Sequence, residues 1–230
     1  MLISLATYNE RENLPILVRE IFQYADDVDI LVIDDNSSDG TAAWVSEQMQ
    51  TDSRLKLIRR PGKMGLGTAT VAAMNFAIEH GYGYLLNMDA DLSHSPQYIP
   101  AIREKANVGF DVVIGSRYVP GGGVEGWPVY RKIMSRCINL YARLLLGLKT
   151  KDNSGSFRCY NVKTLEIMNP DSLISKGYSY LEEILFRLKK NGATFAEVPI
   201  IFVERRFGVS KINIKEAFTA LWLIFRISFT

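Results

Sequence analysis

Short apolar runs alternate with amphipathic segments through the first half of the chain. The apolar runs have the length and composition of buried strands, and they are Leu2–Ala6, Asp29–Ile33, Leu55–Ile58, Tyr82–Met88 and Asp111–Gly115. Segments with helical spacing or helix-starting residues separate them, and these open near Asn13, Thr41, Gly65 and Pro96. This alternation predicts βαβ units, and therefore an α/β, Rossmann-like fold with a mostly parallel sheet flanked by helices.

The second half is less regular, although it keeps helical and extended segments. We expect a long helix over Pro128–Leu148, a shorter one over Tyr180–Lys190, and an extended segment over Thr194–Glu204 in which Pro199 marks an edge or a bend. No internal repeat and no clear linker interrupts the chain. The sequence therefore predicts one main domain over residues 1–211, followed by a helix over residues 212–230.

The predicted C-terminal helix is amphipathic. Its apolar positions are Ile212, Ile214, Phe218, Leu221, Trp222, Phe225 and Phe229. Lys211, Lys215 and Arg226 are basic side chains that could reach toward lipid headgroups from such a helix. The pattern fits a helix in the interface of a bilayer and equally a helix that covers the sheet, and the sequence leaves both open.

Composition excludes several classes of protein. With 47% hydrophobic residues and a net charge of +2, the 230-residue chain is not disordered, and two cysteines make no disulfide framework. We expect no transmembrane helix, because no run of 18 apolar residues occurs. Residues 1–60 hold 11 acidic and 6 basic residues, whereas residues 115–163 hold 9 basic and 2 acidic ones. This basic stretch is either a solvated surface or a site for an anionic partner, and without a nucleic-acid module we expect no nucleic acid.

Polar side chains follow three of the predicted strands. Residues 7–10 (TYNE) follow the first strand, Asp34, Asp35 and Asp39 follow the second, and residues 89–91 (Asp-Ala-Asp) follow the fourth. Ligands of open parallel sheets bind beyond the carboxyl ends of the strands, where these groups would converge. A turn and helix cap at Asp39 would explain one or two of the acids but not acids after three strands.

Asp89 and Asp91 make the sharpest local pattern. Two carboxylates one residue apart, directly after an apolar strand, can turn toward one point. Hard oxygen ligands favour Mg²⁺ or Mn²⁺, which takes its remaining ligands from water and substrate phosphates. His94 lies three residues further on and is more simply neither a metal ligand nor a support for one.

The ordered set of motifs resembles a known family. TYNE, DDNSSDGT, GLGTA and MDADLSH together resemble family 2 glycosyltransferases of the GT-A fold. GSRY, GGVEGWP, RKIMSR, DNSGSFRCY, SKGY and EVPIIFVERRFGVSK are similar to the dolichol-phosphate (polyprenyl-phosphate) mannose synthases within it. The likeness runs from about Leu2 to Lys211, so residues 1–211 would be the GT-A catalytic domain. Ala6 stands where the family usually has proline, and we expect little effect from that.

The resemblance implies a role for each matching residue. The donor nucleotide sugar would be bound by Thr7, Tyr8, Asn9, Glu10, Asp39, Asp89, Ala90, Asp91, Arg205 and Lys211. Asp89 and Asp91 would hold the metal, Mg²⁺ or Mn²⁺, together with the diphosphate. The acceptor phosphate would be bound by Arg117, Arg131 and Ser135, and the catalytic set would be Asp89, Asp91, Arg117 and Arg131.

Helical spacing supports part of this transfer. Arg131 and Ser135 are four residues apart on the predicted helix and share one face. Lys132, Arg136 and Arg143 fall on another face, where solvated charge is the simplest interpretation.

The implied activity is mannosyl transfer from GDP-mannose to dolichyl or polyprenyl phosphate, with inversion to a β-mannosyl phospholipid. The implied location is the cytosolic face of a membrane, which the chain would reach as a peripheral protein or through small membrane anchor subunits. A UDP-glucose-dependent dolichyl-phosphate glucosyltransferase, another family 2 glycosyltransferase and a non-catalytic nucleotide-sugar binding protein stay as alternatives.

Overall fold

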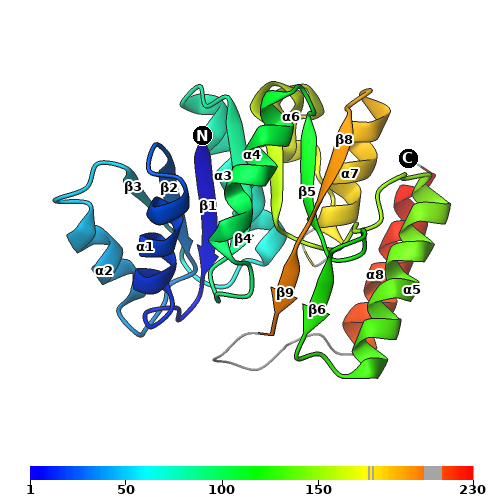
Figure 1. Cartoon of the computed structure of the whole chain (residues 1–230), viewed down its shortest axis with the longest axis horizontal. Coiled ribbons are helices and arrows are strands. Elements are labelled where there is room, and N and C mark those ends of the chain that lie inside the picture. Colours follow the sequence, from blue (N-terminus) through cyan, green and yellow to red (C-terminus); the bar gives the residue numbers. More distant parts are fainter. Residues whose placement is uncertain (176, 178, 205–213, 230) are drawn as a thin grey trace.

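The computed structural model describes residues 1–175, 177, 179–204 and 214–229, with residues 214–220 described by their backbone alone. A seven-stranded sheet with the order β3-β2-β1-β4-β7-β5-β8 forms the centre (Figure 1). Its strands are β1 (Leu2–Thr7), β2 (Asp29–Asp34), β3 (Leu55–Arg59), β4 (Tyr84–Asp89), β5 (Val112–Ser116), β7 (Arg158–Asn161) and β8 (Phe195–Pro199). All neighbours pair in parallel except β7, which runs antiparallel to both β4 and β5. The expected mostly parallel α/β sheet is therefore confirmed.

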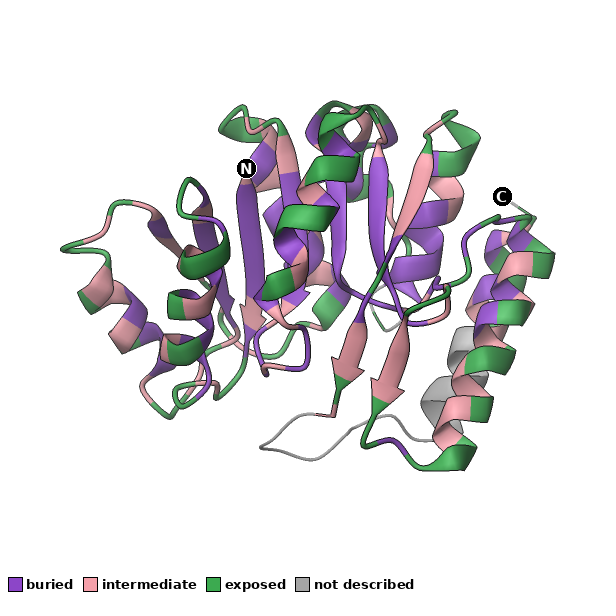
Figure 2. Cartoon of the chain, viewed as in Figure 1, coloured by how far each residue is buried: buried purple, intermediate pink, exposed green. Residues whose placement is uncertain are grey.

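Helices cover both faces of this sheet. They are α1 (Leu14–Tyr24), α2 (Thr41–Gln48), α3 (Leu66–Glu79), α4 (Ile99–Asn107), α5 (Val129–Leu146), α6 (Val162–Met168), α7 (Tyr180–Lys190) and α8 (Ile214–Ile227), with short 3₁₀ turns at Pro96–Tyr98 and Pro170–Ser172. Side chains of α1, α2 and α4 pack on one face. Side chains of α3, α5, α6, α7 and α8 pack on the other. The central strands are buried on both faces (Figure 2), as expected where helices cover a parallel sheet.

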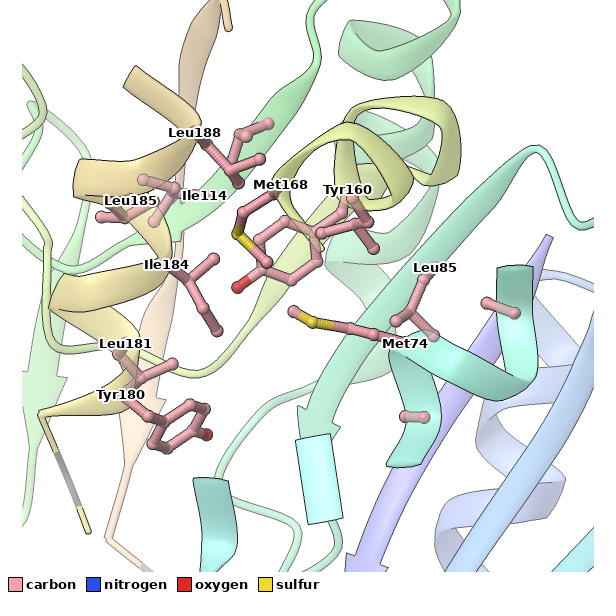
Figure 3. Packing of buried hydrophobic residues seen from close by; sticks show 14 of the residues in the cluster. Met74, Leu85, Ile114, Tyr160, Met168, Tyr180, Leu181, Ile184, Leu185 and Leu188 are labelled. Atoms are coloured by element: carbon pink, nitrogen blue, oxygen red, sulfur yellow. The ribbon is translucent and has the colours of Figure 1, made fainter. Parts of the chain in front are cut away.

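Buried hydrophobic side chains form one cluster on each face of the sheet, and the larger cluster, on the face covered by α3, α5, α6, α7 and α8, joins residues far apart in the sequence. Met74 of α3, Tyr160 of β7 and Ile184 of α7 lie together in it (Figure 3). Helix α8 belongs to the same packing, because Ile224 and Ile227 are buried in this cluster while α8 runs beside α5 (Figure 1). Trp222, in contrast, is 65% exposed. The helix therefore packs on the sheet through one side, as one of the two alternatives expects, and exposes aromatic side chains on another, while its position in a bilayer interface stays a prediction.

A second, two-stranded sheet extends below the carboxyl end of the main one. It pairs β6 (Gly123–Glu125) with β9 (Ile201–Val203) in parallel. The glycines at positions 121 and 122 lead into β6. Gly122 is required there, because a Cβ atom would lie 2.5 Å from the Ser116 carbonyl oxygen. Pro199 ends the edge strand β8, where its missing N–H costs no ladder hydrogen bond.

Candidate active site

The loops after β1 and β2 brace each other at the carboxyl edge of the sheet. The hydroxyl of Thr7 donates to Asp34 at 2.9 Å, and both side chains are buried. Asn9 adopts a left-handed backbone conformation (φ 60°) that a short polar side chain tolerates. Its amide donates to the Ser37 hydroxyl and its side-chain oxygen accepts from the Ser38 amide, so the two loops form one wall.

Asp39 is part of the same wall. Its Oδ1 accepts from the amide and hydroxyl of Thr41, and its Oδ2 accepts from the amide of Arg11. Partial burial works to raise the pKa of Asp39, but these hydrogen bonds outweigh it and lower the pKa. The Glu10 amide also donates to the Thr41 hydroxyl. Asp39 thus fixes the turn and the start of α2, as the alternative interpretation of its sequence expects, while its side chain stays at the surface.

The side chains of Tyr8 and Glu10 lie on the outer side of this wall. Tyr8 is 39% exposed, and the Lys63 ammonium lies 3.4 Å from the centre of its ring. A Glu10 carboxylate oxygen accepts from the Asn13 side chain at 2.7 Å. Thr7 therefore ends β1 as a buried residue, and Tyr8, Asn9 and Glu10 follow it as a polar rim, which is the arrangement that their position after the strand predicts.

Hydroxyl groups donate to a carboxylate oxygen of both Asp89 and Asp91. Asp89 Oδ1 accepts from the Ser156 hydroxyl at 2.7 Å. Asp91 Oδ1 accepts from the amide and hydroxyl of Ser93. The side chain of Asp89 is 32% exposed, whereas Asp91 is 8% exposed and Ala90 between them is buried. The hydroxyl donors fix both carboxylates at the end of β4, one at the rim and one beneath it.

His94 supports this loop from inside the protein. It is 2% exposed, stacks on Phe157, and its Nδ1 accepts a hydrogen bond from the Asp89 amide at 3.2 Å. Burial lowers the pKa of His94, although the nearby Asp89 and Asp91 oppose this shift. A neutral ring that accepts at Nδ1 braces the β4 end. Leu92, in the same loop, has a left-handed backbone (φ 62°), which costs roughly 1–2 kcal/mol for such a residue.

The donor set fits a hard divalent cation that also binds a phosphorylated substrate. Within the described part of the chain, no group of three or more His, Cys, Asp or Glu side chains could enclose a metal ion. Two carboxylates alone suit Mg²⁺ or Mn²⁺, since these ions keep open positions for water and phosphate oxygens. The hydroxyls of Ser93 and Ser156 orient the two carboxylates in the way that supporting groups commonly orient metal ligands.

Arg117, at the end of β5, forms a buried ion pair with Asp152. Its Nε and Nη2 each donate to the carboxylate at 2.7 Å, and its amide donates to Oδ2 at 2.9 Å. Burial alone would lower the pKa of Arg117, but Asp152 raises it overall, so the guanidinium stays charged. Nη2 also donates to the Ser154 hydroxyl, whereas Nη1 has no hydrogen-bond partner among the described residues. The pair therefore fixes the guanidinium plane and leaves Nη1 for a ligand.

Arg131 and Ser135 lie on one face of α5, as their spacing predicts. The Arg131 guanidinium stacks over the Trp127 ring, 3.9 Å from its centre, and donates to Glu204 at 2.8 Å. The Ser135 hydroxyl accepts from the Tyr118 hydroxyl at 2.7 Å, which leaves its own proton to donate. Together with Arg117 these side chains form a cationic wall around Trp127.

The cationic wall and the acidic pair lie on the same side of the sheet, and Phe202 of β9 connects them. The Phe202 ring lies 5.3 Å from the His94 ring, between ring centres, and 5.4 Å from the Trp127 ring. It also lies 5.7 Å from the Arg117 guanidinium carbon. These contacts bring Trp127 and Arg117 of the cationic wall close to His94, which supports the loop that carries the two acids. Arg205 and Lys211, the other two expected cations, lie outside the described residues.

Residues 3–168 match the family described as Glycosyl transferase family 2. Polyprenol monophosphomannose synthase of Mycolicibacterium smegmatis is 41% identical over 94% of this chain and 83% of its own length. Undecaprenyl-phosphate mannosyltransferase of Micrococcus luteus is 39% identical over 93% of this chain and 87% of its own length. The chain belongs to glycosyltransferase family 2.

Solved structures share the fold of this glycosyltransferase at low sequence identity. Glucosyl-3-phosphoglycerate synthase from Mycobacterium tuberculosis, crystallised with Mn²⁺ and UDP, superposes with a TM-score of 0.64 at 16% identity, covering 98% of this chain and 77% of its own. A mannosyltransferase from Pyrobaculum calidifontis, crystallised with GDP-Man and Mn²⁺, gives a TM-score of 0.57 at 16% identity, covering 89% and 56%. The expectation of a GT-A-like sheet is confirmed.

Sequence reasoning did not identify several residues that build the glycosyltransferase site. Asp152 and Ser156 both lie in the motif DNSGSFRCY, which contributed to the resemblance without a role being assigned to its members. Asp152 carried a signal, because it is one of only two acids among the charged residues of the basic stretch 115–163. An isolated acid in such a stretch is a candidate ion-pair partner. No sequence signal pointed to Trp127, since a single tryptophan in a loop fits core packing equally well.

Glu182 is a buried acid of the glycosyltransferase outside the expected site. It lies in the first turn of α7, is 3% exposed, and its Oε2 has no hydrogen-bond partner among the described residues. Burial raises the pKa of Glu182 from 4.5 to about 7, although the charge of Arg158 opposes the shift. The side chain therefore titrates near neutral pH.

The described helices do not include a membrane span. Each of them is too short or too polar to cross a lipid bilayer.

Proposed function

We propose that this glycosyltransferase transfers a mannosyl group from GDP-mannose to polyprenyl or dolichyl phosphate and inverts the anomeric centre, which gives a β-mannosyl phospholipid. The observation that carries the proposal is the identity of 41% with a polyprenol monophosphomannose synthase along 94% of the chain. The geometry supports it, because such a reaction brings two phosphate-bearing substrates together. It needs an acidic, metal-binding side and a cationic side that meet.

The donor side consists of the loops after β1, β2 and β4. Thr7, Tyr8, Asn9, Glu10 and Asp39 would receive the nucleotide along the braced polar wall. Asp89, Ala90 and Asp91 would receive the diphosphate, with Asp89 and Asp91 holding Mg²⁺ or Mn²⁺. When bound, the divalent cation neutralises negative charge on the departing nucleoside diphosphate.

The acceptor side consists of the end of β5, helix α5 and the loop at residues 147–157. Arg117, fixed by Asp152, and Arg131, stacked on Trp127, would bind the oxygens of the lipid phosphate, and Ser135 would donate its hydroxyl proton to it. A planar guanidinium suits this task, because its parallel N–H groups match the spacing of phosphate oxygens.

The reaction follows from positioning. A phosphate monoester is ionised near neutral pH, so its oxygen attacks the anomeric carbon without a general base. The new bond forms as the bond to GDP breaks on the opposite side of the carbon, and an α-linked donor gives a β-linked product. In this scheme neither Asp89 nor Asp91 acts as a general base, because the attacking phosphate oxygen is already ionised. The arginines offset the repulsion between the acceptor phosphate and the donor diphosphate.

We place the enzyme at the cytosolic face of a membrane, because the acceptor carries a long hydrocarbon chain and the surfaces of α5 and α8 expose apolar side chains. Tyr130 and Leu144 of α5 are 71% and 75% exposed, and Trp222 of α8 is 65% exposed. Attachment through these helices is sufficient in this proposal, and small membrane anchor subunits would strengthen it.

A transfer assay tests the proposal. Purified protein with Mn²⁺, labelled GDP-mannose and a short-chain polyprenyl phosphate should give labelled lipid, with β configuration by NMR of the product. Parallel reactions use UDP-glucose as donor and a polyprenol without phosphate as acceptor. Product from UDP-glucose in place of GDP-mannose would replace the proposed donor, and product from the free polyprenol would contradict the proposed nucleophile. Binding of GDP-mannose without transfer under any of these conditions would reduce the protein to a nucleotide-sugar binder.

A further inference from the structure

A cavity of about 470 Å³ lies between α5 and the segment that joins β5 to β6. Its walls are the residues 117–122 on one side and, on the other, Arg136, Asn139, Leu140 and Arg143 of α5, with Lys151 at the end. Arg136 and Arg143 are seven residues apart, two helical turns, and therefore share a face. Arg131 and Ser135 do not line this cavity. The cavity is thus beside the acceptor side and separate from the residues proposed there, apart from Arg117 at its inner end.

Apart from Arg117, the cations of this cavity have no acidic partner among the described residues. None of Arg136, Arg143 and Lys151 forms an ion pair with an acid in the part of the chain that the structure describes. The two nearby acids have other partners, because Asp152 pairs with Arg117 and Glu197 of β8 accepts from the amides of residues 151 and 152. Like charges that converge without a counter-charge are costly, and an anion offsets that cost.

Arg143 gives a second, independent indication. Its Nε is buried and has no hydrogen-bond partner among the described residues. A buried donor without a partner is uncommon in a folded protein and points to a missing acceptor. The same guanidinium lines the cavity, so an anion seated there is within reach of this donor group. This assigns a use to the α5 cations that the sequence leaves as solvated charge.

Apolar surface borders the cavity and indicates what carries the anion. Leu140 lines the cavity and is 53% exposed, and Leu144, one turn further along α5, is 75% exposed. The outer side of α5 is open to solvent (Figure 2), and α8 beside it exposes Trp222 and Phe229. A phosphate group directly next to hydrocarbon is the chemistry of a phospholipid headgroup at the bilayer interface.

We propose that the cavity at Arg136, Arg143 and Lys151 binds a second phosphate group, that of an anionic membrane phospholipid, and so docks α5 on the membrane beside the acceptor side. The proposal is independent of which sugar or donor the enzyme uses. Its function would be to hold the acceptor side against the bilayer in which the polyprenyl chain is dissolved. A soluble phosphate shares this chemistry, and the experiment separates the two sources.

Vesicle sedimentation with the full chain tests the proposal. The protein is mixed with phosphatidylcholine vesicles and with vesicles that also contain phosphatidylglycerol, at fixed ionic strength. Binding to the anionic vesicles should fall about tenfold or more in Arg136→Gln/Arg143→Gln/Lys151→Gln. Arg19→Gln/Lys105→Gln/Lys163→Gln, which removes the same charge from exposed positions on α1, α4 and α6, should fall much less. Equal losses in both triple variants would overturn the proposal, because they would show that vesicle binding depends on the net charge of the protein and not on this cavity.

Two further experiments test the same proposal. Arg136→Gln/Lys151→Gln changes only exposed side chains and should show the same direction of effect even if loss of Arg143 disturbs folding. Inorganic phosphate added to wild type, against chloride at equal ionic strength, should displace it from the vesicles if the cavity recognises phosphate. Strong phosphate binding without a preference for anionic vesicles would support the phosphate site and assign it to a soluble source, whereas binding of neither would overturn it.

Kinetics distinguish this cavity from the acceptor site. With a short-chain polyprenyl phosphate in detergent, the triple variant should keep the wild-type KM. A KM that rises as much as vesicle binding falls would mean that these cations belong to the acceptor site and would overturn a second site. Failure of mannosyl transfer in every protein would leave the vesicle result unaffected, so the two proposals fail separately.

Discussion

The donor side and the acceptor side hold their charged groups in different ways. On the donor side, Asp39 and Asp91 are oriented by amides and hydroxyls from residues at most a few dozen positions away, and Asp89 by Ser156. On the acceptor side, Arg117 pairs with Asp152, 35 residues on, and Arg131 pairs with Glu204, 73 residues on. Asp39 and Asp89 accept hydrogen bonds from amides and hydroxyls, which do not offset their negative charge. Acidic partners on the acceptor side fix the arginines but offset part of their charge.

The difference has an energetic consequence. A carboxylate near the surface, such as Asp39 or Asp89, is stabilised by hydrogen bonds at little desolvation cost, because it remains partly hydrated. The Arg117–Asp152 pair is almost fully buried, at 7% and 0% exposure. Burying two charges costs a large desolvation free energy, and their attraction repays it only when their hydrogen bonds are complete. Changes on the donor side should therefore affect chemistry first, and changes on the acceptor side should affect folding as well as binding.

Asp91→Asn should have the largest effect. The substitution keeps the shape and the hydrogen bonds from Ser93 but removes the charge that would face the metal and diphosphate. We expect turnover to fall about a thousandfold, roughly 4 kcal/mol, with the midpoint of urea unfolding little changed. Transfer assays and urea unfolding of the same preparations measure both. Asp27→Asn, which breaks the exposed pair with Arg103, is the matched control and should leave turnover unchanged. Full activity of Asp91→Asn would remove the metal from the proposed site.

Asp152→Asn should mainly destabilise the fold. It leaves the buried Arg117 guanidinium without its carboxylate counter-charge, which costs about 3 kcal/mol in comparable buried pairs. Urea unfolding measures the loss. The same Asp27→Asn control breaks an exposed pair and should cost less than about 1 kcal/mol. Similar small losses in both variants would contradict the contrast drawn between the two sides.

Arg131→Ala should separate acceptor binding from donor binding. Loss of one charged guanidinium contact to the lipid phosphate should raise the KM for polyprenyl phosphate about thirtyfold, roughly 2 kcal/mol, without changing the Kd of GDP-mannose. Steady-state kinetics and calorimetric titration measure the two quantities. Lys132→Ala, on the neighbouring face of α5, is the matched control and should leave both near wild type. An equal loss of acceptor use and donor binding would mean that Arg131 serves the donor.

Glu182→Gln should show the smallest effect, and only through pH. The pKa of Glu182 is raised to about 7 in the folded protein, so the folded state keeps a proton that the unfolded chain releases near 4.5. Stability is then lost as the pH rises from 4.5 through 7, and roughly 1 kcal/mol of that loss falls between pH 6 and 8. Gln carries no such proton, so urea unfolding at pH 6, 7 and 8 should show a smaller decline in the variant. Parallel declines in the two proteins would mean that Glu182 is ionised throughout this range.

The sequence predicted where the polar residues of the sheet edge lie because these signals are local. A strand that ends in polar residues marks the edge of the sheet, and TYNE, Asp39 and Asp89-Ala90-Asp91 lie after β1, β2 and β4 as expected. Their donor-binding roles stay a prediction. The five expected parallel strands were found for the same reason, since their apolar runs are continuous. Helix α6 and the pairing of β6 with β9 were missed, because a seven-residue helix and three-residue strands carry too little periodicity.

The chain by itself therefore determined the strand and helix alternation, the acids at the carboxyl edge and the two-residue spacing that suits a divalent cation, all of which depend on neighbours along the sequence. Only the tertiary structure decided that β7 enters antiparallel between β4 and β5, that Asp152 fixes Arg117, and that Phe202 lies between His94 and Trp127. It also decided that the cations of α5 at Arg136 and Arg143 face a cavity. The physical reason is that ion pairs and aromatic contacts depend on distance in space, and no spacing along the chain encodes a contact between residues dozens of positions apart.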